Sequence, residues 1–241
     1  MFADFYKTDK NKLDKKYSKY SLSKCPHCGI VPKKKNTKKF KCTDCNEFVF
    51  VKKINDKYYF LTESQNKEVG EMRKFDVLKD KYFNTLVNNG YTQHQLENEF
   101  DRSHITTVEQ LKDFIWLSFN NLINVHSTDL KAKSFLYFAM ARFCALERNG
   151  DDVYGLQKIA FDCQLMCDRD LIKSDIVYDV KIYSYPNNPE CYKDHNKTWL
   201  YEEMIKNPIL PHLVKDSKMG CTCTYSVVAR IDEDGLFVWK D

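Results

Sequence analysis

Cys25-Pro26-His27-Cys28-Gly29 and, further along, Cys42-Thr43-Asp44-Cys45-Asn46 decide the fold of the first part of the chain. In each CxxC turn two thiolates aim at one point, and Gly29 supplies the positive φ that such a turn needs. Two such turns on adjacent hairpins form a tetrahedral site of four sulfurs, the geometry that Zn²⁺ favours. Because Cys25, Cys28, Cys42 and Cys45 fill all four positions, the sequence predicts one structural zinc ion in a zinc ribbon.

Two other uses of these cysteines stay open, namely a pair of disulfides and a redox-active CxxC. Disulfides require an oxidising compartment. The start of the chain is polar and lysine-rich, without the apolar segment of a secretory signal. No apolar run approaches the roughly 18 residues that suggest a membrane span. We therefore expect a cytoplasmic protein without membrane contact, and favour metal binding.

The periodicity of apolar residues predicts an α+β protein in three parts. Residues 1–61 contain a short helix over 2–20 and the zinc ribbon, which ends in the strand-like runs FVFVKK and KYYFL. Residues 62–174 show apolar spacings of three and four, which predict a helical body that ends in an antiparallel helix hairpin. After 174 the period changes to two, which predicts a small α+β tail over 175–241. Its expected elements are the strand IVYDVKIYSY, a helix over 198–206, and the strands TYSVVARI and GLFVW.

The charge of the chain is unevenly distributed. Residues 1–60 contain sixteen lysines, no arginine and six acidic residues, a net charge of +10, so residues 61–241 carry −6 of the total of +4. A basic module joined to a mildly acidic body is one signature of nucleic-acid contact. The alternative that stays open is a solvated, lysine-rich face with no partner.

The loop between the two CxxC turns is the candidate contact surface. It carries one aromatic residue among many lysines: Lys33, Lys34, Lys35, Lys38, Lys39, Phe40 and Lys41. Lysines neutralise phosphates and bases stack on exposed aromatic rings, so the loop can bind nucleic acid. Two alternatives remain: Phe40 faces the core of the hairpin, or the partner is an acidic protein surface.

A second group of possible metal ligands lies near the end of the chain. Cys221-Thr222-Cys223 can donate two thiolates, and Cys191 with His212 or His195 can complete a site. The spacing of these residues is irregular, and a CxC is less diagnostic than a CxxC. Buried cysteines that pack as small apolar residues are therefore the favoured interpretation, with a second metal ion as the alternative.

Evidence for catalysis is thin. Asp175, Asp179 and Lys181 faintly suggest the D…DxK arrangement of some metal-dependent nucleases, but any exposed strand with alternating polar residues gives the same pattern. The chain has no GxSxG, HExxH or phosphate-binding glycine loop. We expect a protein that is not an enzyme and that needs no small-molecule cofactor.

The order of the motifs resembles that of a known group of proteins. The run CPHCG…KKKNTKKFKCTDCNEFVFVKK, followed by YYFLTESQ, resembles a zinc ribbon of uncharacterised proteins from Gram-positive bacteria and their phages. The segment ALERNGDDVYGLQKIAFDCQLM is similar to the helix pair of the same proteins. The end of the chain, with EC, NKTWLYEEMIKNPILPH and GCTCTY, is also similar to theirs. It further resembles the cysteine-rich tail of phage head-morphogenesis (minor head) proteins.

The tail departs from that pattern in three places. Its first CxxC is here Asn188-Pro189-Glu190-Cys191, so one ligand that the resemblance implies is absent. Asn196 stands where the pattern has Gly, and Thr222 stands where it has Arg. The resemblance implies a phage or prophage setting rather than an activity.

Together these observations predict a zinc-binding, non-enzymatic adaptor or regulator of phage or prophage origin. Its basic ribbon is expected to contact nucleic acid or an acidic protein surface, in the cytoplasm of a bacterial host or in association with a virion. One alternative is a phage head or virion assembly component that acts through protein–protein contacts. The other is a metal-dependent nuclease.

Overall fold

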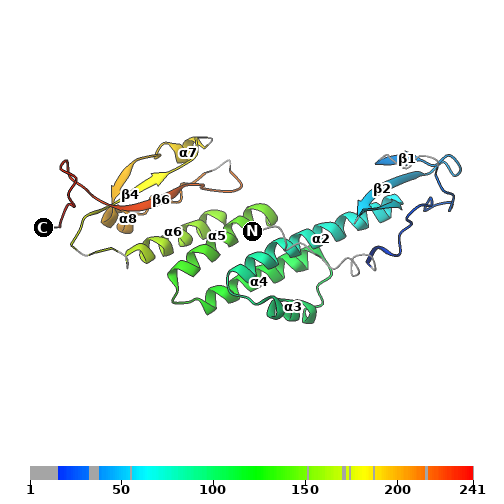
Figure 1. Ribbon diagram of the computed structural model, residues 1–241, viewed down its shortest axis with the longest axis horizontal. Coiled ribbons are helices and arrows are strands. Elements are labelled where there is room, and N and C mark those ends of the chain that lie inside the picture. Colours follow the sequence, from blue (N-terminus) through cyan, green and yellow to red (C-terminus); the bar gives the residue numbers. More distant parts are fainter. Residues whose placement is uncertain are drawn as a thin grey trace. The chain divides into compact units, whose positions relative to one another are not determined.

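The computed structural model describes residues 16–32, 38–54, 56–150, 152–169, 172–173, 175–186, 188–214 and 217–240. The protein is of mixed α and β structure, as predicted: an N-terminal three-stranded sheet, a helical body, and a small C-terminal sheet with helices (Figure 1). Most of the helix predicted over 2–20 lies outside the described residues.

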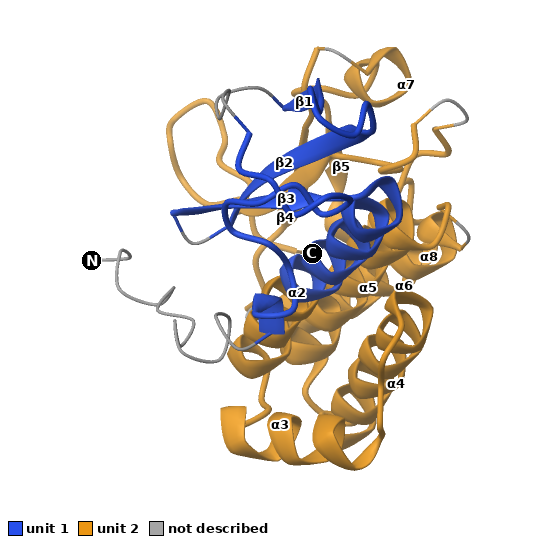
Figure 2. Cartoon of the chain, turned by 90° about the vertical axis from the view of Figure 1, so that its right-hand side faces the viewer, with its two compact units in different colours: residues 1–78 blue, residues 79–241 orange. Residues whose placement is uncertain are grey.

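Two compact units make up the chain, residues 1–78 and residues 79–241 (Figure 2). The boundary falls inside the long helix α2 (Glu63–Asn88). The predicted division into three domains stays a prediction, because compactness alone does not show which part of a chain folds by itself.

The ribbon sheet contains the strands β1 (Lys39–Lys41), β2 (Phe48–Ile54) and β3 (Lys57–Leu61), paired antiparallel in the order β1-β2-β3. Residues that pair across an antiparallel ladder lie on the same face of the sheet. The register pairs Phe40 with Val49, and Lys39 with Phe50. Phe40 and Lys39 therefore lie on opposite faces.

Each face of this sheet packs against a different part of the unit. On the face of Phe40, a small core contains the buried residues Cys25, Cys42, Val49 and Phe60. On the other face, a second core joins the sheet to the first turns of α2 and to the segment before the ribbon; its buried residues are Tyr17, Tyr20, Ile54, Tyr59, Leu61 and Val69. The ribbon thus contributes to two cores, and its cysteines belong to one of them.

The helical body follows α2 with α3 (Gln93–Arg102), α4 (Val108–Val125), α5 (Leu130–Glu147) and α6 (Val153–Arg169). The predicted antiparallel hairpin is formed by α5 and α6, where the rings of Phe138 and Phe161 meet edge to face at 5.0 Å. Over the described ranges, no helix combines the length and the apolar character that crossing a membrane requires.

The tail contains the sheet β5-β4-β6, with β4 (Tyr178–Tyr183), β5 (Thr198–Leu200) and β6 (Thr224–Ala229) antiparallel, and the short helices α7 (Pro189–Tyr192) and α8 (Tyr201–Lys206). One face of the sheet packs on α6 and α8 through a core of Leu165, Val180, Tyr201 and Met204.

Two predicted elements of the tail are corrected. The helix predicted over 198–206 begins only at Tyr201, because the three residues before it pair with β4, Trp199 opposite Val180. The run GLFVW forms isolated bridges, such as Trp239 with Ile176, in place of a continuous strand. In both places pairing with a distant segment, rather than local periodicity, decides the backbone.

Candidate metal centres

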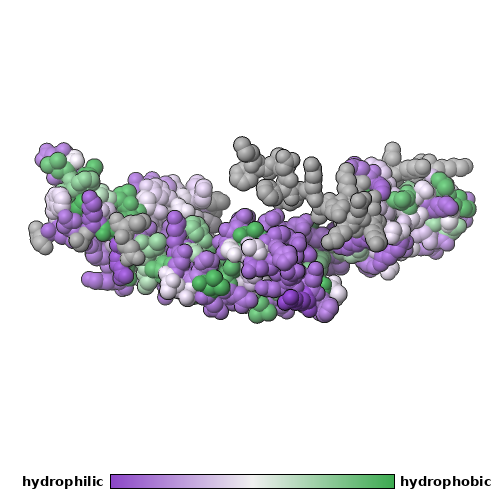
Figure 3. All heavy atoms as spheres, turned by 60° about the horizontal axis from the view of Figure 1, so that its bottom comes forward, coloured by the Kyte–Doolittle hydropathy of each residue, from purple (hydrophilic) through white to green (hydrophobic). Residues whose placement is uncertain are grey.

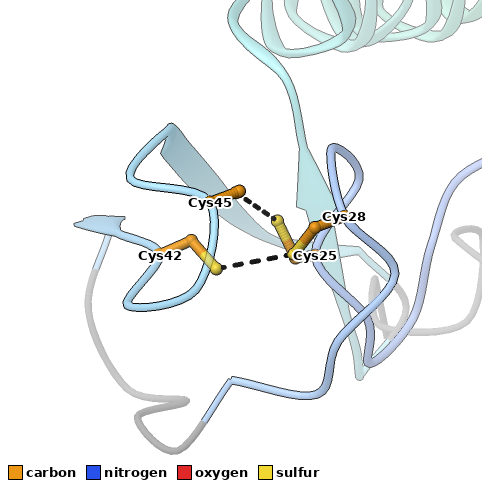
Figure 4. Close-up of side chains that lie close together, drawn as sticks. All are labelled: Cys25, Cys28, Cys42 and Cys45. Atoms are coloured by element: carbon orange, nitrogen blue, oxygen red, sulfur yellow. Dashed lines mark hydrogen bonds between the residues drawn. The ribbon is translucent and has the colours of Figure 1, made fainter.

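The four ribbon cysteines converge on one point. Their Sγ atoms all lie within 4.8 Å of one another, and Figure 4 shows the side chains pointing together from two loops. The Sγ atoms of Cys25 and Cys45 are 3.7 Å apart, and those of Cys28 and Cys42 are 3.8 Å apart. Two sulfurs bound at about 2.3 Å to a tetrahedral zinc ion would be ~3.8 Å apart, whereas a disulfide would bring them to about 2.0 Å. The group therefore has the dimensions of a metal site.

The two CxxC turns share the same pattern of backbone hydrogen bonds. The N–H of Gly29 donates to the carbonyl of Cys25 at 2.9 Å, and the N–H of Asn46 donates to that of Cys42 at 2.9 Å. Both Gly29 and Asn46 have positive φ, 78° and 67°. In each turn the N–H of the first cysteine also bonds the carbonyl five residues on, at 2.8 Å. Each turn thus holds its two cysteines through local backbone bonds.

Local hydrogen bonds favour the thiolate at one cysteine of this site, Cys42. Backbone hydrogen bonds from Cys45 and then Asp44 lower the pKa of the Cys42 thiol to about 7. The thiolate is the form of cysteine that binds a metal ion. The lowered pKa of Cys42 and the convergence of the four Sγ atoms therefore both favour metal binding.

The second group, in the tail, also converges. Cys191, His212, Cys221 and Cys223 place one ligand atom each within 4.8 Å of the others. All four residues are buried, and none is more than 8% exposed. Sequence reasoning favoured simple packing here. The structure instead brings four ligand atoms to one point, so both this group and the ribbon group can hold a metal ion.

Separations in the tail group fit a tetrahedral ion. The Sγ atoms of Cys191 and Cys221 are 3.8 Å apart. His212 Nδ1 lies 3.3 Å from the Sγ of Cys223 and 3.9 Å from that of Cys221. A nitrogen and a sulfur on one tetrahedral zinc ion would be ~3.6 Å apart. His195, the other candidate ligand, is used elsewhere: its Nδ1 accepts from the backbone N–H of Ser184 at 3.1 Å.

Electrostatics within the tail group differ between its thiols. Hydrogen bonds with Cys223, and to a lesser degree with His212, lower the pKa of Cys221 to about 4 against the opposing effect of burial. Burial raises the pKa of Cys191. The thiolate is therefore favoured at Cys221 and the neutral thiol at Cys191.

The lysine loop is only partly covered by the structure. Lys33, Lys34 and Lys35 lie outside the described residues. Lys38, Lys39 and Lys41 are exposed, as a nucleic-acid surface requires. Phe40 is partly buried and packs edge to face on Phe60 at 6.0 Å, on the same face as the cysteines. Of the two orientations left open for Phe40, the structure has the one toward the hairpin core, which leaves its ring unavailable for stacking.

Sequence reasoning missed an exposed aromatic residue next to these lysines. Phe48 is 51% exposed, and it pairs with Lys41 across β1 and β2. The ammonium of Lys39 lies 4.2 Å from the centre of the Phe48 ring. The alternation of FVFV indicates that one of two neighbouring residues faces solvent, because Phe48 and Val49 must point to opposite faces of the sheet. Only the pairing decides which of the two is buried.

The residues of the suggested nuclease motif do not assemble into a metal site in the part of the chain that the structure describes. Asp179 is held by Arg230, whose Nε and Nη2 donate to its two oxygens at 2.9 and 2.5 Å. The ammonium of Lys181 lies 5.6 Å from the ring of Tyr183. Asp175 and Asp179 belong to neither group of converging ligands. No observation on these residues favours the nuclease alternative.

No protein-family model, no curated protein and no solved structure matches this chain. The resemblance to phage-associated zinc-ribbon proteins therefore stays a prediction. Function has to be inferred from the two candidate metal centres and from the surface of the ribbon.

Proposed function

We propose that the chain is a zinc-binding, non-enzymatic adaptor or regulator whose basic ribbon contacts nucleic acid in a phage or prophage setting. The observation that carries the proposal is the exposed surface of Lys39, Lys41 and Phe48, on the face of the ribbon sheet opposite the four converging cysteines. The resemblance of the ribbon motif supports the setting. Two features of the ribbon support contact with nucleic acid, namely the role of the metal ion and the chemistry of the exposed surface.

The first feature is the role of the metal. Four thiolates around one zinc ion leave no position for water or substrate, so the ion acts structurally. The core behind the cysteines is small, with two of its four buried residues being Cys25 and Cys42 themselves. In so small a core, metal binding supplies much of the folding free energy. The zinc ion would thus join the turn of Cys25 and Cys28 to the turn between β1 and β2. It would stabilise the two strands that carry the exposed lysines and Phe48.

The second feature is the surface itself. Lys39 and Lys41 lie on the face opposite Phe40, next to the half-exposed ring of Phe48. A strand of nucleic acid can stack a base on Phe48 while the two ammonium groups neutralise neighbouring phosphates. An acidic protein surface would use the lysines but would not require the ring. The combination therefore favours single-stranded nucleic acid.

Fluorescence anisotropy of labelled oligonucleotides, single-stranded and duplex, tests the proposal on the zinc-loaded full chain over a range of salt. We expect salt-sensitive binding that is similar for different base sequences, because phosphate contacts carry no base information. The double variant Lys39→Glu/Lys41→Glu should lower the affinity at least tenfold and reduce the salt slope by roughly 1 to 2 units. Phe48→Ala should weaken single-strand binding with little change in the slope, since stacking is worth about 1–3 kcal/mol per base.

Lys131→Glu/Lys158→Glu is the control with the same change in net charge, a pair of exposed lysines on α5 and α6, and should leave binding nearly unchanged. Equal losses in this control and in the ribbon variant would mean that only the overall charge matters. No binding by the intact chain at low salt would reject nucleic acid as the partner and favour an acidic protein surface.

A second candidate, a head or virion assembly component that acts through protein contacts, is favoured by one observation. The C-terminal segment exposes several large apolar side chains: Ile231, Leu236, Phe237 and Trp239, each between 52% and 66% exposed. Figure 3 shows hydrophobic atoms at the end of the tail that Figure 1 draws in red. Exposed apolar groups of this kind mark protein contacts. Co-sedimentation with phage capsid or portal proteins, lost in Leu236→Ser/Phe237→Ser, would support this candidate over the first.

A further inference from the structure

We infer that Cys191, His212, Cys221 and Cys223 hold a second zinc ion, in a closed structural centre that joins α7, the segment of His212 and the loop that leads into β6. This inference is independent of the proposed contact with nucleic acid. It rests on the positions of the four ligand atoms, on the partner of His212, and on the way Cys221 is held.

The ligand atoms come from three separate segments. Cys191 lies in α7, His212 in the segment before the CxC, and Cys221 and Cys223 in the loop that leads into β6. Ordinary apolar packing fills volume but does not aim four donor atoms at one point. A tetrahedral ion requires that convergence, and the observed separations agree with it.

The imidazole of His212 is oriented for coordination through Nδ1. Its Nε2 lies 2.8 Å from the Oδ2 of Asp194, a carboxylate that also pairs with Lys197 at 3.0 Å. An ionised carboxylate only accepts hydrogen bonds, so Nε2 carries a proton. Nδ1 faces the thiols and, in the neutral imidazole, offers its lone pair to a metal ion. Metal-bound histidines usually have such a carboxylate on the far ring nitrogen, which fixes the tautomer and the ring plane. Asp194 is therefore a positioning residue for the centre.

The loop of the CxC is fixed to α6 by one buried side chain. Gln157 donates through Nε2 to the carbonyl of Cys221 at 2.9 Å, and its Oε1 accepts from the N–H of Cys221 at 2.9 Å. A third bond joins Nε2 to the carbonyl of Met219 at 3.1 Å. Gly220, with φ of 69°, lets the loop approach: a Cβ there would lie 2.5 Å from Gln157 Oε1. The ion would thus join α7 and the segment of His212 to a loop that Gln157 already holds against α6.

The ligand set identifies the metal and its role. Three thiolates and one imidazole form a soft, tetrahedral set typical of structural zinc. All four positions are filled by buried side chains, so no position is left for a substrate. The centre therefore contributes stability rather than catalysis.

Native mass spectrometry of the zinc-loaded chain tests the inference by counting ions. We expect two zinc ions on the intact chain, one on Cys42→Ser, and one on Cys221→Ser. Cys167→Ser is the matched control, a partly buried cysteine of α6 outside both groups, and should keep two. One ion on the intact chain together with none on Cys42→Ser would overturn the inference and leave the tail cysteines as packing residues. Because this pair of counts needs no tail variant, misfolding of Cys221→Ser cannot obscure the result.

Cobalt substitution distinguishes the two centres by their ligands. In Cys42→Ser the remaining ion should show the charge-transfer absorption of three thiolates, and in Cys221→Ser that of four. Cobalt in Cys42→Ser without thiolate charge transfer would contradict the assignment, since it would indicate an ion bound elsewhere.

Asp194→Asn tests the positioning role. Zinc affinity of the tail centre, measured in the Cys42→Ser background by competition with a chromophoric chelator, should fall about 10- to 100-fold, as for other residues that orient a metal-bound histidine. Glu190→Gln is the control, because Glu190 is exposed and pairs with Lys193 rather than with a ligand. An unchanged affinity in Asp194→Asn would refute the role of Asp194.

Discussion

At the scale of single residues, the ribbon depends on two positions that follow its CxxC turns. Gly29 and Asn46 occupy the same place in the two turns and share a positive φ. Glycine tolerates this region freely and asparagine tolerates it well, whereas a β-branched residue does not. Asn46 in the second turn therefore indicates that asparagine can also replace Gly29 in the first turn.

Gly29→Asn should retain zinc with near-native affinity, because Asn46 already adopts this backbone conformation and nothing lies within 4 Å of a Cβ on Gly29. Gly29→Val should weaken zinc binding about tenfold or more, since strain of about 1–3 kcal/mol in the folded turn reduces metal affinity directly. Chelator competition on the two variants measures the difference. Equal affinities would show that the positive φ of Gly29 is not required.

At the scale of elements, local side-chain signals set the starts of several helices. Three helices begin with the same capping box, in which a threonine and a glutamine three residues later exchange hydrogen bonds with each other's backbone N–H groups: Thr62 with Gln65, Thr92 with Gln95, and Thr107 with Gln110. The sequence places helix starts at these threonines because the motif acts through neighbours in the chain.

Thr107→Ala should lower the free energy of unfolding by about 1 kcal/mol, because the first turn of α4 loses its side-chain acceptor. In a protein of this size the melting temperature should fall by roughly 2–4 °C. Thr85→Ala is the comparison variant, since Thr85 lies inside α2, is partly exposed and donates its hydroxyl to the carbonyl of Lys81. There alanine should be neutral or slightly stabilising. Thermal unfolding of both variants checks the prediction, and equal melting temperatures would contradict it.

At the scale of the whole molecule, the two units have separate cores. Residues 79–241 contain an aromatic core of their own, in which the ring of Phe143 meets those of Tyr82 and Phe119 at 4.8 and 6.2 Å. The ribbon core instead contains two of the candidate zinc ligands, Cys25 and Cys42. Metal loss from the ribbon should therefore affect the two units differently.

Cys42→Ser should release the ribbon zinc and unfold the ribbon, while the far-ultraviolet circular dichroism of the helices stays largely intact. Any helical loss should be limited to the first turns of α2, which pack on the ribbon through Val69. Circular dichroism before and after the substitution measures this. Collapse of the whole helical signal would mean that residues 79–241 do not fold without the ribbon.

Several features of this protein are determined by the sequence alone. The four candidate ligands of the ribbon are set by two short motifs, since each CxxC turn is closed by backbone bonds between neighbours, such as that from the N–H of Gly29 to the carbonyl of Cys25. The mixed α+β fold class, the capped helix starts and the hairpin of α5 and α6 also follow from local patterns. In each case the deciding signal lies among neighbouring residues, as in the turn between α5 and α6, so the order of side chains suffices to predict the feature.

Tertiary structure decided the rest. Phe48 rather than Phe40 is exposed because the register of β1 and β2 turns one face toward the cysteines. Asp179 pairs with Arg230 because β6 lies beside β4. The candidate ligands of the tail centre come from α7 and from two later segments of the chain. The sequence names them as candidates, but their irregular spacing does not show that they converge. Contacts of this kind depend on which distant segments pair and pack. Those pairings are determined by the burial of apolar surface over the whole unit, so short stretches of sequence do not predict them.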